Sequence, residues 1–438
     1  MNILFIHQNF PGQYRHLAPA LAAQGHTVIG VGEKNNLKNY PHIPGVQRIG
    51  YPTPQPAGEA THRYLRGFEG QVRRGQQVAR SVLALKEKGF TPDLMLGHPG
   101  WGEILYLKDI HPQVPLVGLF EFYYHGQGQD SGFDPEFALD PNFALDGLCR
   151  IRTKNVNNLL ALEAVDVGVC PTAYQKSVMP PEYQGKLRIL HDGINTQVAK
   201  PDPEATFTLT TTDPPQELSR QQEIITFINR NLEPYRGYHI FMRSLPRLLR
   251  ERPQAQVLIV GGDGVSYGPA APEGQTWKQI FLGEVQPQLD LNRVHFLGRI
   301  PYPQLIRLLQ VSSLHVYLSY PFVLSWSMLE AMACGCLVVG SRTPPVEEVI
   351  RPGENGLLVD FFDPDQLVDT IHTGLNHPTR MQPLRTAARQ TIVNTYDLDT
   401  ICLPQQLHFI NELLQGSPGI NELLQGSPGN SARLKDGG

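Results

Sequence analysis

The chain has 438 residues, which is too many for one hydrophobic core, so we expect two domains that each bury a core of their own. Charged residues make up 18% of the chain, and the formal net charge is −4. A nucleic-acid-binding protein needs a concentrated basic face to neutralise phosphates. The composition argues against that class, and we expect no nucleic-acid partner.

The cysteines and the N-terminus bear on the compartment. Of five scattered cysteines only Cys334 and Cys336 lie close together, at a spacing unusual for a zinc site, so we expect free, buried thiols in a reducing compartment. The first residues lack the features of a signal peptide, and no apolar run approaches the roughly 20 residues of a membrane span. The prediction is a soluble, cytoplasmic protein, and peripheral contact with a membrane stays open.

Strands and helices alternate along the first half of the chain. Ile3–Ile6 is a continuous apolar run, which is typical of a strand buried on both faces of a parallel sheet. A Pro11-Gly12 turn follows, and then an amphipathic helix that ends near Gly25. Further apolar runs predict strands at 28–31, 94–96, 116–119 and 167–169. The first domain is predicted to cover residues 1–195.

A stretch rich in Pro and Thr, residues 196–222, is interpreted as a linker. The alternation then restarts, with strands predicted at 224–228, 257–260, 294–296, 314–317 and 337–339 and a helix at 238–250. The second domain is predicted at 223–395, a closing helix at 396–415 and a disordered tail at 416–438. In this region residues 410–419 are repeated letter for letter as 420–429.

The predicted fold class is α/β, with two facing Rossmann-like domains whose parallel sheets border an interdomain cleft. Ligands of such sheets bind at the carboxyl ends of the strands. Gly12 follows the first strand, where backbone approaches a phosphate, although a lone glycine there is also an ordinary turn residue. Gly262 lies in a Gly-Gly-Asp-Gly turn that lacks the Gly-x-Gly-x-x-Gly spacing, so a dinucleotide site is a minor alternative.

The most informative segment is residues 325–335, where a strand end leads into a helix that stops at Gly335. The free N–H groups and the dipole of such a helix start attract phosphate oxygens. Ser327 and Glu330 also have the spacing of a capping box, in which the carboxylate only satisfies the helix end. Local chemistry favours this capping interpretation over a ligand contact.

The wider pattern resembles glycosyltransferase family four, whose members are retaining enzymes of the GT-B fold. Residues 329–335 and 338–341 resemble its donor-site signature. Four further segments are similar to the family's basic pair, glycine turn, phosphate-side loop and closing stretch, in the same order: 227–237, 260–264, 294–298 and 347–359. The resemblance is specific over residues 224–363 and looser in the first half.

The resemblance implies roles for individual residues. Arg230 and Arg236 match the family's basic pair and would neutralise the leaving diphosphate, although the second is Arg where the family has Lys and lies one residue further along. Both are alternatively solvated arginines at a helix start. Glu330 would hold the ribose hydroxyls. Backbone groups would contact diphosphate and sugar at four further donor-binding positions: Gly262, Gly298, Ser325 and Trp326.

One position departs from the family pattern. A first glutamate is expected eight residues before Glu330, and Phe322 stands there instead. Either another acid replaces it, or a different donor sugar is held by apolar contact, or the enzyme has lost activity.

The first domain is expected to supply the acceptor side. His98 and Glu103 follow one strand end, and Glu121 and His125 follow another. Family members often place a histidine at the second of these places, which falls on Glu121 here. We therefore consider Glu121 and His125 as catalytic residues, and Glu121 as the replacement for the missing acid. Each of these residues is about as often a satisfied polar group beside a loop.

No metal site and no cofactor are predicted, because the nucleotide-sugar is a substrate. Asp363-Pro364-Asp365 and Asp397-Leu398-Asp399 have a spacing that other glycosyltransferases use for manganese, but both lie away from the strand ends and are interpreted as helix caps. An acidic loop at 127–146 is expected to line the acceptor side.

We predict a glycosyltransferase that moves a sugar from a uridine or guanosine diphosphate sugar to a hydroxyl acceptor, with retention and without metal. A cell-surface glycan or a related sugar is the expected acceptor. The alternatives are a catalytically lapsed nucleotide-sugar-binding protein, kept open by Phe322, and a nucleotide-sugar epimerase of the same fold. A phosphorylase would need a pyridoxal-binding lysine, for which no motif is found.

Overall fold

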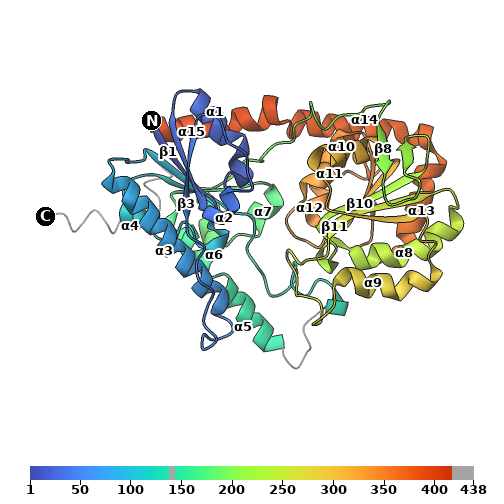
Figure 1. Cartoon of the computed structure of the whole chain (residues 1–438), viewed down its shortest axis with the longest axis horizontal. Coiled ribbons are helices and arrows are strands. Elements are labelled where there is room, and N and C mark those ends of the chain that lie inside the picture. Colours follow the sequence, from blue (N-terminus) through green and yellow to red (C-terminus); the bar gives the residue numbers. More distant parts are fainter. Residues whose placement is uncertain (138–143, 417–438) are drawn as a thin grey trace. The chain divides into compact units, whose positions relative to one another are not determined.

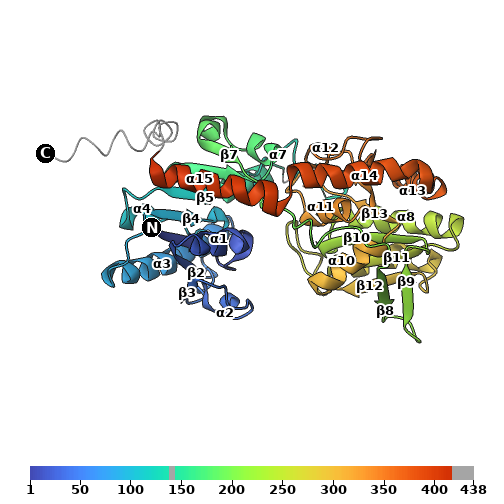
Figure 2. The same cartoon turned by 90° about the horizontal axis from the view of Figure 1, so that it is seen from above.

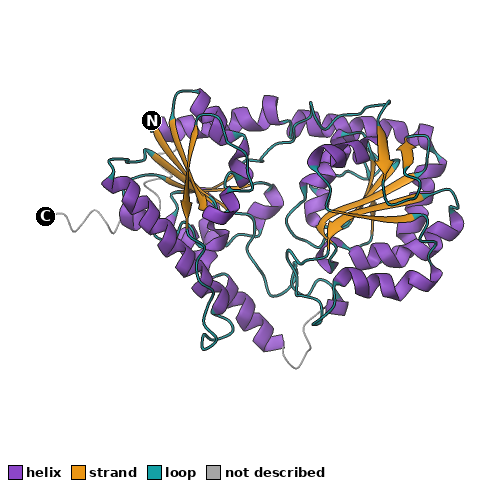
Figure 3. Cartoon of the chain, in the orientation of Figure 1, coloured by secondary structure: helices purple, strands orange, loops and turns teal. Residues whose placement is uncertain are grey.

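The computed structural model describes residues 1–137 and 144–416, and the chain divides into two compact units. Unit 1 comprises Met1–Asp192 and Asp399–Gly438, and unit 2 comprises Gly193–Leu398. Each unit is a parallel sheet enclosed by helices (Figures 1 and 3). The predicted disordered tail lies outside the described residues, apart from Gly416.

The sheet of unit 1 has seven parallel strands in the order β3-β2-β1-β4-β5-β6-β7. Their bounds are β1 Asn2–Ile6, β2 Thr27–Glu33, β3 Val46–Tyr51, β4 Leu94–Gly97, β5 Leu116–Leu119, β6 Val167–Cys170 and β7 Leu187–Ile189. The strands β3 and β7 were not predicted. They form the sheet edges and carry exposed residues, so neither is a continuous apolar run.

Alternate side chains of β1 fill two separate cores in unit 1. Ile3 and Phe5 pack on α1 (Leu17–Ala23) and α15 (Leu403–Gln415), and Figure 2 shows α15 lying along the unit. Leu4 and Ile6 pack on the opposite face against other helices. These are α3 Arg66–Glu87, α4 Leu107–Ile110 and α6 Val156–Ala164, while α2 Lys34–Leu37, α5 Ala144–Lys154 and α7 Ala173–Ser177 lie in connections.

The sheet of unit 2 has six parallel strands in the order β12-β11-β10-β13-β14-β15. Their bounds are β10 Ile224–Asn231, β11 Gln256–Gly262, β12 Val294–Gly298, β13 Leu314–Tyr317, β14 Leu337–Ser341 and β15 Leu357–Val359. One core forms against α10 (Tyr302–Val311), α11 (Trp326–Ala333) and α14 (Pro378–Thr395). The remaining helices of this unit are α8 Tyr238–Glu251, α9 Trp277–Val285, α12 Pro344–Glu347 and α13 Pro364–Asn376.

The stretch that was interpreted as a linker belongs to unit 2 and contains an antiparallel hairpin. Its strands are β8 (Thr206–Leu209) and β9 (Gln216–Ser219), and the apolar side chains of Phe207, Leu209 and Leu218 are buried in the core of the unit. The two strands were not predicted, because the stretch around them is rich in proline and threonine. The expected closing helix begins only at Leu403, after a turn of π-helix, and belongs to unit 1.

All five cysteines are free, but Cys149 is exposed, contrary to the expectation that all are buried.

Among the described residues, no helix is both long and apolar enough to cross a membrane.

Strand order reverses once in each sheet. In unit 1 the chain runs outward through β2 and β3 and then returns to place β4 beside β1, and in unit 2 it returns to place β13 beside β10. The carboxyl ends of strands at such a reversal leave a crevice in which ligands of parallel sheets bind. Functional side chains are therefore expected at the carboxyl ends of β1 and β4 in unit 1 and of β10 and β13 in unit 2.

Candidate functional site

Arg236 lies at the strand-order reversal of unit 2. It ends the short helical turn that follows β10, and its side chain is 4% exposed. Its Nη1 donates to the Tyr317 hydroxyl at 3.1 Å and to Ser319 Oγ at 2.8 Å, both at the end of β13. Burial works to lower its pKa, but Tyr317, Tyr267 and Glu233 outweigh burial and raise it. The guanidinium is therefore a fixed, permanently charged group.

The Tyr317 hydroxyl connects this arginine to α11. It accepts a second hydrogen bond, from the backbone N–H of Ser325 at 2.9 Å. Ser325 is the N-cap of α11, and its Oγ accepts from the N–H of Ser327 at 3.3 Å. A helix start and a cation thus lie at the same strand-order reversal, and both attract anions.

The capping-box interpretation of Ser327 and Glu330 is wrong. The N-cap is Ser325, so Ser327 lies inside the helix and donates to the Ile228 carbonyl at 3.4 Å. Glu330 is then too far into α11 to reach back to the cap, and it is buried at 6% exposure. Two serines separated by one residue make the register of the cap ambiguous in the sequence. The ligand role that the family resemblance implies for Glu330 stays a prediction.

Phe322 is part of an aromatic group formed with Tyr235 and Tyr267. Its ring centroid lies 5.5 Å from that of Tyr235 and 4.9 Å from that of Tyr267. The guanidinium carbon of Arg236 lies 5.1 Å from the Tyr267 centroid and 5.9 Å from the Phe322 centroid. The position where the family has an acid is thus filled by a buried ring beside the cation, which attracts the charge without neutralising it.

The glycine turn after β11 is held by side chains from β10 and its loop. The Glu233 carboxylate accepts from the N–H groups of Ser266 and Tyr267, at 3.1 and 3.2 Å. A Cβ on Gly262 would lie 2.7 Å from both Asn231 Oδ1 and Arg299 Nε, which explains glycine there. Gly298 has φ +63°, a left-handed conformation that glycine adopts at low cost.

The two arginines of the predicted basic pair are not equivalent. Arg230 is exposed near the end of β10, whereas Arg236 is buried and held by two hydroxyls. The difference in exposure arises because β10 continues through Arg230 to Asn231. Arg230 is therefore part of the strand, whereas Arg236 is part of the helical turn that follows it.

Unit 1 brings four predicted or neighbouring residues together at its own strand-order reversal. The histidine cluster comprises His7 after β1, His98 and Trp101 after β4, and Glu121 after β5. His98 Nε2 lies 3.4 Å from Glu121 Oε2, and Gln13 Nε2 donates to Glu121 Oε1 at 2.6 Å. Burial opposes ionisation of Glu121, but His98 and Gln13 outweigh it and lower the pKa. Glu121 is therefore a carboxylate at neutral pH.

His98 is held in a single orientation. Its Nδ1 accepts from the N–H of Gly100 at 3.1 Å, and its ring stacks on Trp101 with centroids 4.4 Å apart. Because Nδ1 is an acceptor, the neutral ring carries its proton on Nε2, toward Glu121.

Glu103 is completely buried. Its Oε1 accepts from the Tyr51 hydroxyl at 2.8 Å, and its Oε2 meets no hydrogen-bond partner in the described part of the chain. Burial raises the pKa of Glu103 to about 7, despite the opposing effects of Tyr51, His98 and Arg74.

Gly12 and His125 have local structural partners. A Cβ on Gly12 would lie 2.5 Å from Cε1 of the His7 ring, and its φ is +51°, so glycine is needed for this imidazole to pack on the backbone. His125 Nε2 lies 2.7 Å from the carbonyl oxygen of Val178 and donates to it. His125 is thus occupied by a backbone contact rather than joined to Glu121.

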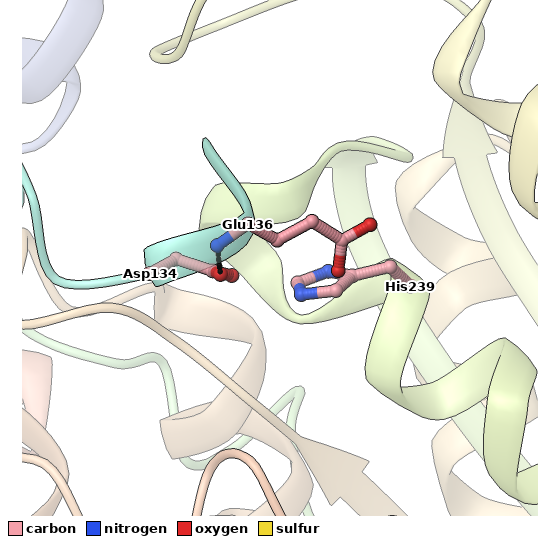
Figure 4. A group of neighbouring side chains, drawn as sticks. All are labelled: Asp134, Glu136 and His239. Atoms are coloured by element: carbon pink, nitrogen blue, oxygen red, sulfur yellow. Dashed lines mark hydrogen bonds between the residues drawn. The ribbon is translucent and has the colours of Figure 1, made fainter. Parts of the chain in front are cut away.

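The acidic residues have several roles. The Glu136 N–H donates to Asp134 Oδ1 at 3.0 Å within unit 1 (Figure 4), and Asp140 of the acidic loop lies outside the described residues. Asp363 caps α13 by accepting from the Gln366 N–H at 2.8 Å, as predicted. Asp397 directly precedes the π-helical turn Leu398–Cys402, and it is buried and accepts from the Thr196 hydroxyl.

Two family models match the chain in tandem. The Glycosyl transferase family 4 group matches residues 24–199, and the Glycosyl transferases group 1 matches residues 210–391. The chain belongs to glycosyltransferase family 4. The second match contains the whole of 224–363, over which the sequence motifs resembled this family.

Curated relatives match only in part. D-inositol 3-phosphate glycosyltransferase of Corynebacterium efficiens is 30% identical over 156 residues, 35% of this chain and 35% of the relative. Glycogen synthase of Mycobacterium tuberculosis is 26% identical over 170 residues, 39% of this chain and 38% of the relative. The chain therefore spans little more than a third of the length of the relatives it matches.

Solved structures match over almost the whole chain. Sucrose-phosphate synthase from Thermosynechococcus elongatus has a TM-score of 0.72 and 18% identity, covering 95% of this chain and 100% of that one. Anabaena HepE in complex with UDP and glucose has a TM-score of 0.61 and 20% identity, covering 94% and 99%. The family 4 chain thus has the GT-B fold, with two Rossmann-like domains.

Several residues of these sites were missed in the sequence, although each had a signal. His7 directly follows the first strand, and Gln13 follows Gly12. Tyr317 ends the strand beside β10, Ser319 follows two residues later, and Arg299 follows the glycine at the end of β12. In each case the signal is a polar residue at or just after a strand end. Such a residue indicates a site only when the strand order shows which strand ends are neighbours.

The buried carboxyl of Glu103 gives the family 4 chain a testable pH dependence. Because its pKa is raised, the folded state keeps a proton that the unfolded state loses above its usual pKa near 4.5, so stability falls as pH rises from about 4.5 to about 7. Glu103→Gln should remove this loss and stabilise unit 1 by up to about 3 kcal/mol at pH 8.

Urea unfolding of both proteins at pH 5 and pH 8 measures this difference. Gln keeps an acceptor for the Tyr51 hydroxyl, so the two proteins should be similar at low pH. An equal pH dependence of wild type and Glu103→Gln would contradict a raised pKa.

Proposed function

We propose that this family 4 protein transfers a sugar from a uridine or guanosine diphosphate sugar to a hydroxyl acceptor, with retention at the anomeric carbon and without a metal ion. The diphosphate binds to unit 2, at the crevice of Arg236 and α11. The acceptor hydroxyl binds to unit 1, at the histidine cluster.

The observation that carries this proposal is the arrangement around the Tyr317 hydroxyl. A buried arginine and the N–H of a helix N-cap are fixed by the same phenol oxygen, at the strand-order reversal of unit 2. Such fixed donors require no reorganisation when negative charge develops on a leaving diphosphate. A cation in this place also supplies the charge that a metal ion would otherwise provide.

Glu121 is proposed to orient the acceptor. It is ionised, and its two oxygens are held by Gln13 and the His98 contact, so its remaining lone pairs can accept from a hydroxyl. The backbone is fixed as well, since Gln175 Nε2 donates to the Glu121 carbonyl at 2.7 Å. Family members often have a histidine at this strand end, near the anomeric region of the donor sugar, and this resemblance supports a role for Glu121 in gripping a sugar.

A second candidate function is that of a nucleotide-sugar-binding protein without turnover. Phe322 supports it, because a ring stands where the family has the acid that grips the donor sugar. Both functions predict diphosphate binding at Arg236, and only the transferase predicts release of the diphosphate.

The decisive experiment is incubation of the full chain with a panel of uridine and guanosine diphosphate sugars, alone and with mixed sugar acceptors. UDP-glucose is the first donor to test, since Anabaena HepE of the same fold was crystallised with it. Diphosphate release shows turnover, and NMR of the product's anomeric proton shows retention or inversion. Tight diphosphate binding with no release under any condition would favour the binding protein.

Arg236→Ala should lower kcat on the order of 10²- to 10³-fold, because it removes a fixed donor to the leaving phosphate. Its burial means that stability also falls, by about 1–3 kcal/mol, since Tyr317 and Ser319 lose their partner. The assay is therefore run well below the melting temperature of the variant. Arg342→Ala, at an exposed arginine paired with Glu347 at 3.6 Å, is the control and should retain the wild-type rate. A folded Arg236→Ala with normal kcat would refute the assignment.

Activity should persist in excess chelator. Arg236 and the start of α11 supply positive charge at the proposed diphosphate site, so no divalent ion is required there. The measurement is diphosphate release with and without EDTA, followed by addition of Mg²⁺ or Mn²⁺. Loss of rate in EDTA that either ion restores would overturn the metal-independent mechanism.

Phe322→Glu should lower turnover at least about 10-fold instead of restoring a missing acid. A buried carboxylate beside Arg236 would pair with the guanidinium and neutralise the charge meant for phosphate. Phe322→Tyr keeps the ring and serves as the control, with a rate close to wild type. Higher activity of Phe322→Glu than of wild type with any donor would contradict this prediction. It would show that an acid at position 322 still supports turnover.

A further inference from the structure

His7 is a buried residue whose position is fixed on several sides. Its ring is 2% exposed and packs against Gly12, where no Cβ could be accommodated. Its centroid lies 5.2 Å from that of Trp101 and 5.4 Å from that of His98, both in edge contacts. The Asn9 N–H donates to its Nδ1 at 3.0 Å. The imidazole therefore has one orientation.

This orientation leaves a donor without a partner. Since Nδ1 is an acceptor, the neutral ring carries its proton on Nε2. His7 Nε2 meets no hydrogen-bond partner among the residues that the structure describes. The Gln13 side chain lies close enough to raise the pKa of the ring, and its amide nitrogen donates to Glu121, but His7 Nε2 makes no hydrogen bond to its amide oxygen. Buried donors without partners are rare and point to a ligand atom.

The surroundings decide which ligand chemistry fits. Glu121 is ionised and contributes an acceptor, so a phosphate group in this place would be repelled. The imidazole N–H of His7 contributes a donor, and the half-buried indole of Trp101 contributes an apolar face. A hydroxyl both donates and accepts, and a sugar carries apolar C–H faces between its hydroxyls. The set of groups therefore matches a neutral polyhydroxyl ligand.

We propose that His7 binds the acceptor of the reaction, by donating its Nε2–H to a hydroxyl oxygen of a sugar or polyol whose neighbouring hydroxyl donates to Glu121. The inference rests on the proposed function, because it takes the ligand of unit 1 to be the sugar acceptor. It adds a specificity-determining residue that neither the motifs nor the strand pattern singled out.

His7 acts here as a donor and not as a base. Burial and the neighbouring His98 lower its pKa to about 3, with Glu121 and Gln13 opposing them, so the ring is neutral above pH 5. The titratable groups that face it are His98, Glu121 and Tyr14. Its contribution to acceptor binding should therefore be the same at pH 6 and pH 8, unlike that of a general base.

Two isosteric half-replacements separate ligand binding from a structural role. His7→Asn keeps an acceptor at the Nδ1 position for the Asn9 N–H and loses the donor at Nε2. His7→Gln keeps a donor at the Nε2 position and loses the acceptor at Nδ1. If His7 binds the acceptor, His7→Asn should raise acceptor KM roughly 3- to 10-fold, while His7→Gln stays within about 2-fold of wild type. Donor KM and diphosphate affinity should stay unchanged in both.

A merely structural role predicts the opposite order. His7→Gln, which loses the bond to Asn9, would then be the more damaged protein in melting temperature and in every kinetic constant. That order, or an equal acceptor KM in all three proteins, overturns the inference.

A failure of the proposed function is distinguishable. If wild type turns over no donor, binding of glucose, galactose, mannose and N-acetylglucosamine to the three proteins is compared by saturation-transfer-difference NMR. The inference stands if a sugar that binds wild type and His7→Gln gives a weaker signal with His7→Asn. It is overturned if no sugar binds wild type, or if His7→Asn binds equally well.

Discussion

The Tyr317 hydroxyl is the contact on which the unit 2 site depends. It accepts from Arg236 and from the Ser325 N–H, so one phenol oxygen fixes the turn after β10 to the first residue of α11. A phenol serves here better than a carboxylate, because it accepts both bonds without neutralising the arginine or the helix start. Its own position is set by β13, which ends with Tyr317 in the middle of the sheet.

The C-terminal end of α11 is stabilised by positively charged side chains. Three arginines donate to carbonyls at its end and just past it: Arg389 to Ala333 at 2.6 Å, Arg220 to Cys334 at 3.1 Å and Arg385 to Gly335 at 3.4 Å. These carbonyls have no partner within the helix and carry the negative end of its dipole. The arginines therefore anchor a helix of only eight residues, whose opposite end then presents its N–H groups in a constant place.

The central strands of both sheets could be predicted from the sequence, whereas the hairpin of β8 and β9 and the N-cap of α11 could not. Runs such as Ile3–Ile6 and 257–260 are apolar on both faces because they lie inside the sheets, and such continuous runs predict buried parallel strands. β8 alternates over only four residues and β9 has a single buried residue, Leu218, so their burial depends on the core that they cover. Ser325 and Ser327 have equal capping propensity, and the sequence does not show the hydrogen bond that holds the Ser325 N–H on the Tyr317 hydroxyl.

The candidate site shows the same limit. Glu121 and His98 were predicted from strand ends, but their pairing with His7 depends on β1 and β4 being neighbours, which 87 intervening residues conceal. The two arginines looked equivalent because one-dimensional spacing does not show where β10 ends. Strand-end residues thus become a site only when the order of the strands is known.

The two sites differ in charge in a way that fits the two parts of a transfer reaction. The unit 2 site presents a buried guanidinium among rings and hydroxyls, which favours an anion and leaves its charge intact. The unit 1 site presents a carboxylate and a neutral imidazole donor, which disfavours an anion and suits a hydroxyl. A nucleotide-sugar and a neutral acceptor would therefore be sorted by electrostatics before any base or sugar is recognised. Phe322 preserves this difference in charge. An acid in its place would add a negative charge beside Arg236, as Glu121 does in the unit 1 site.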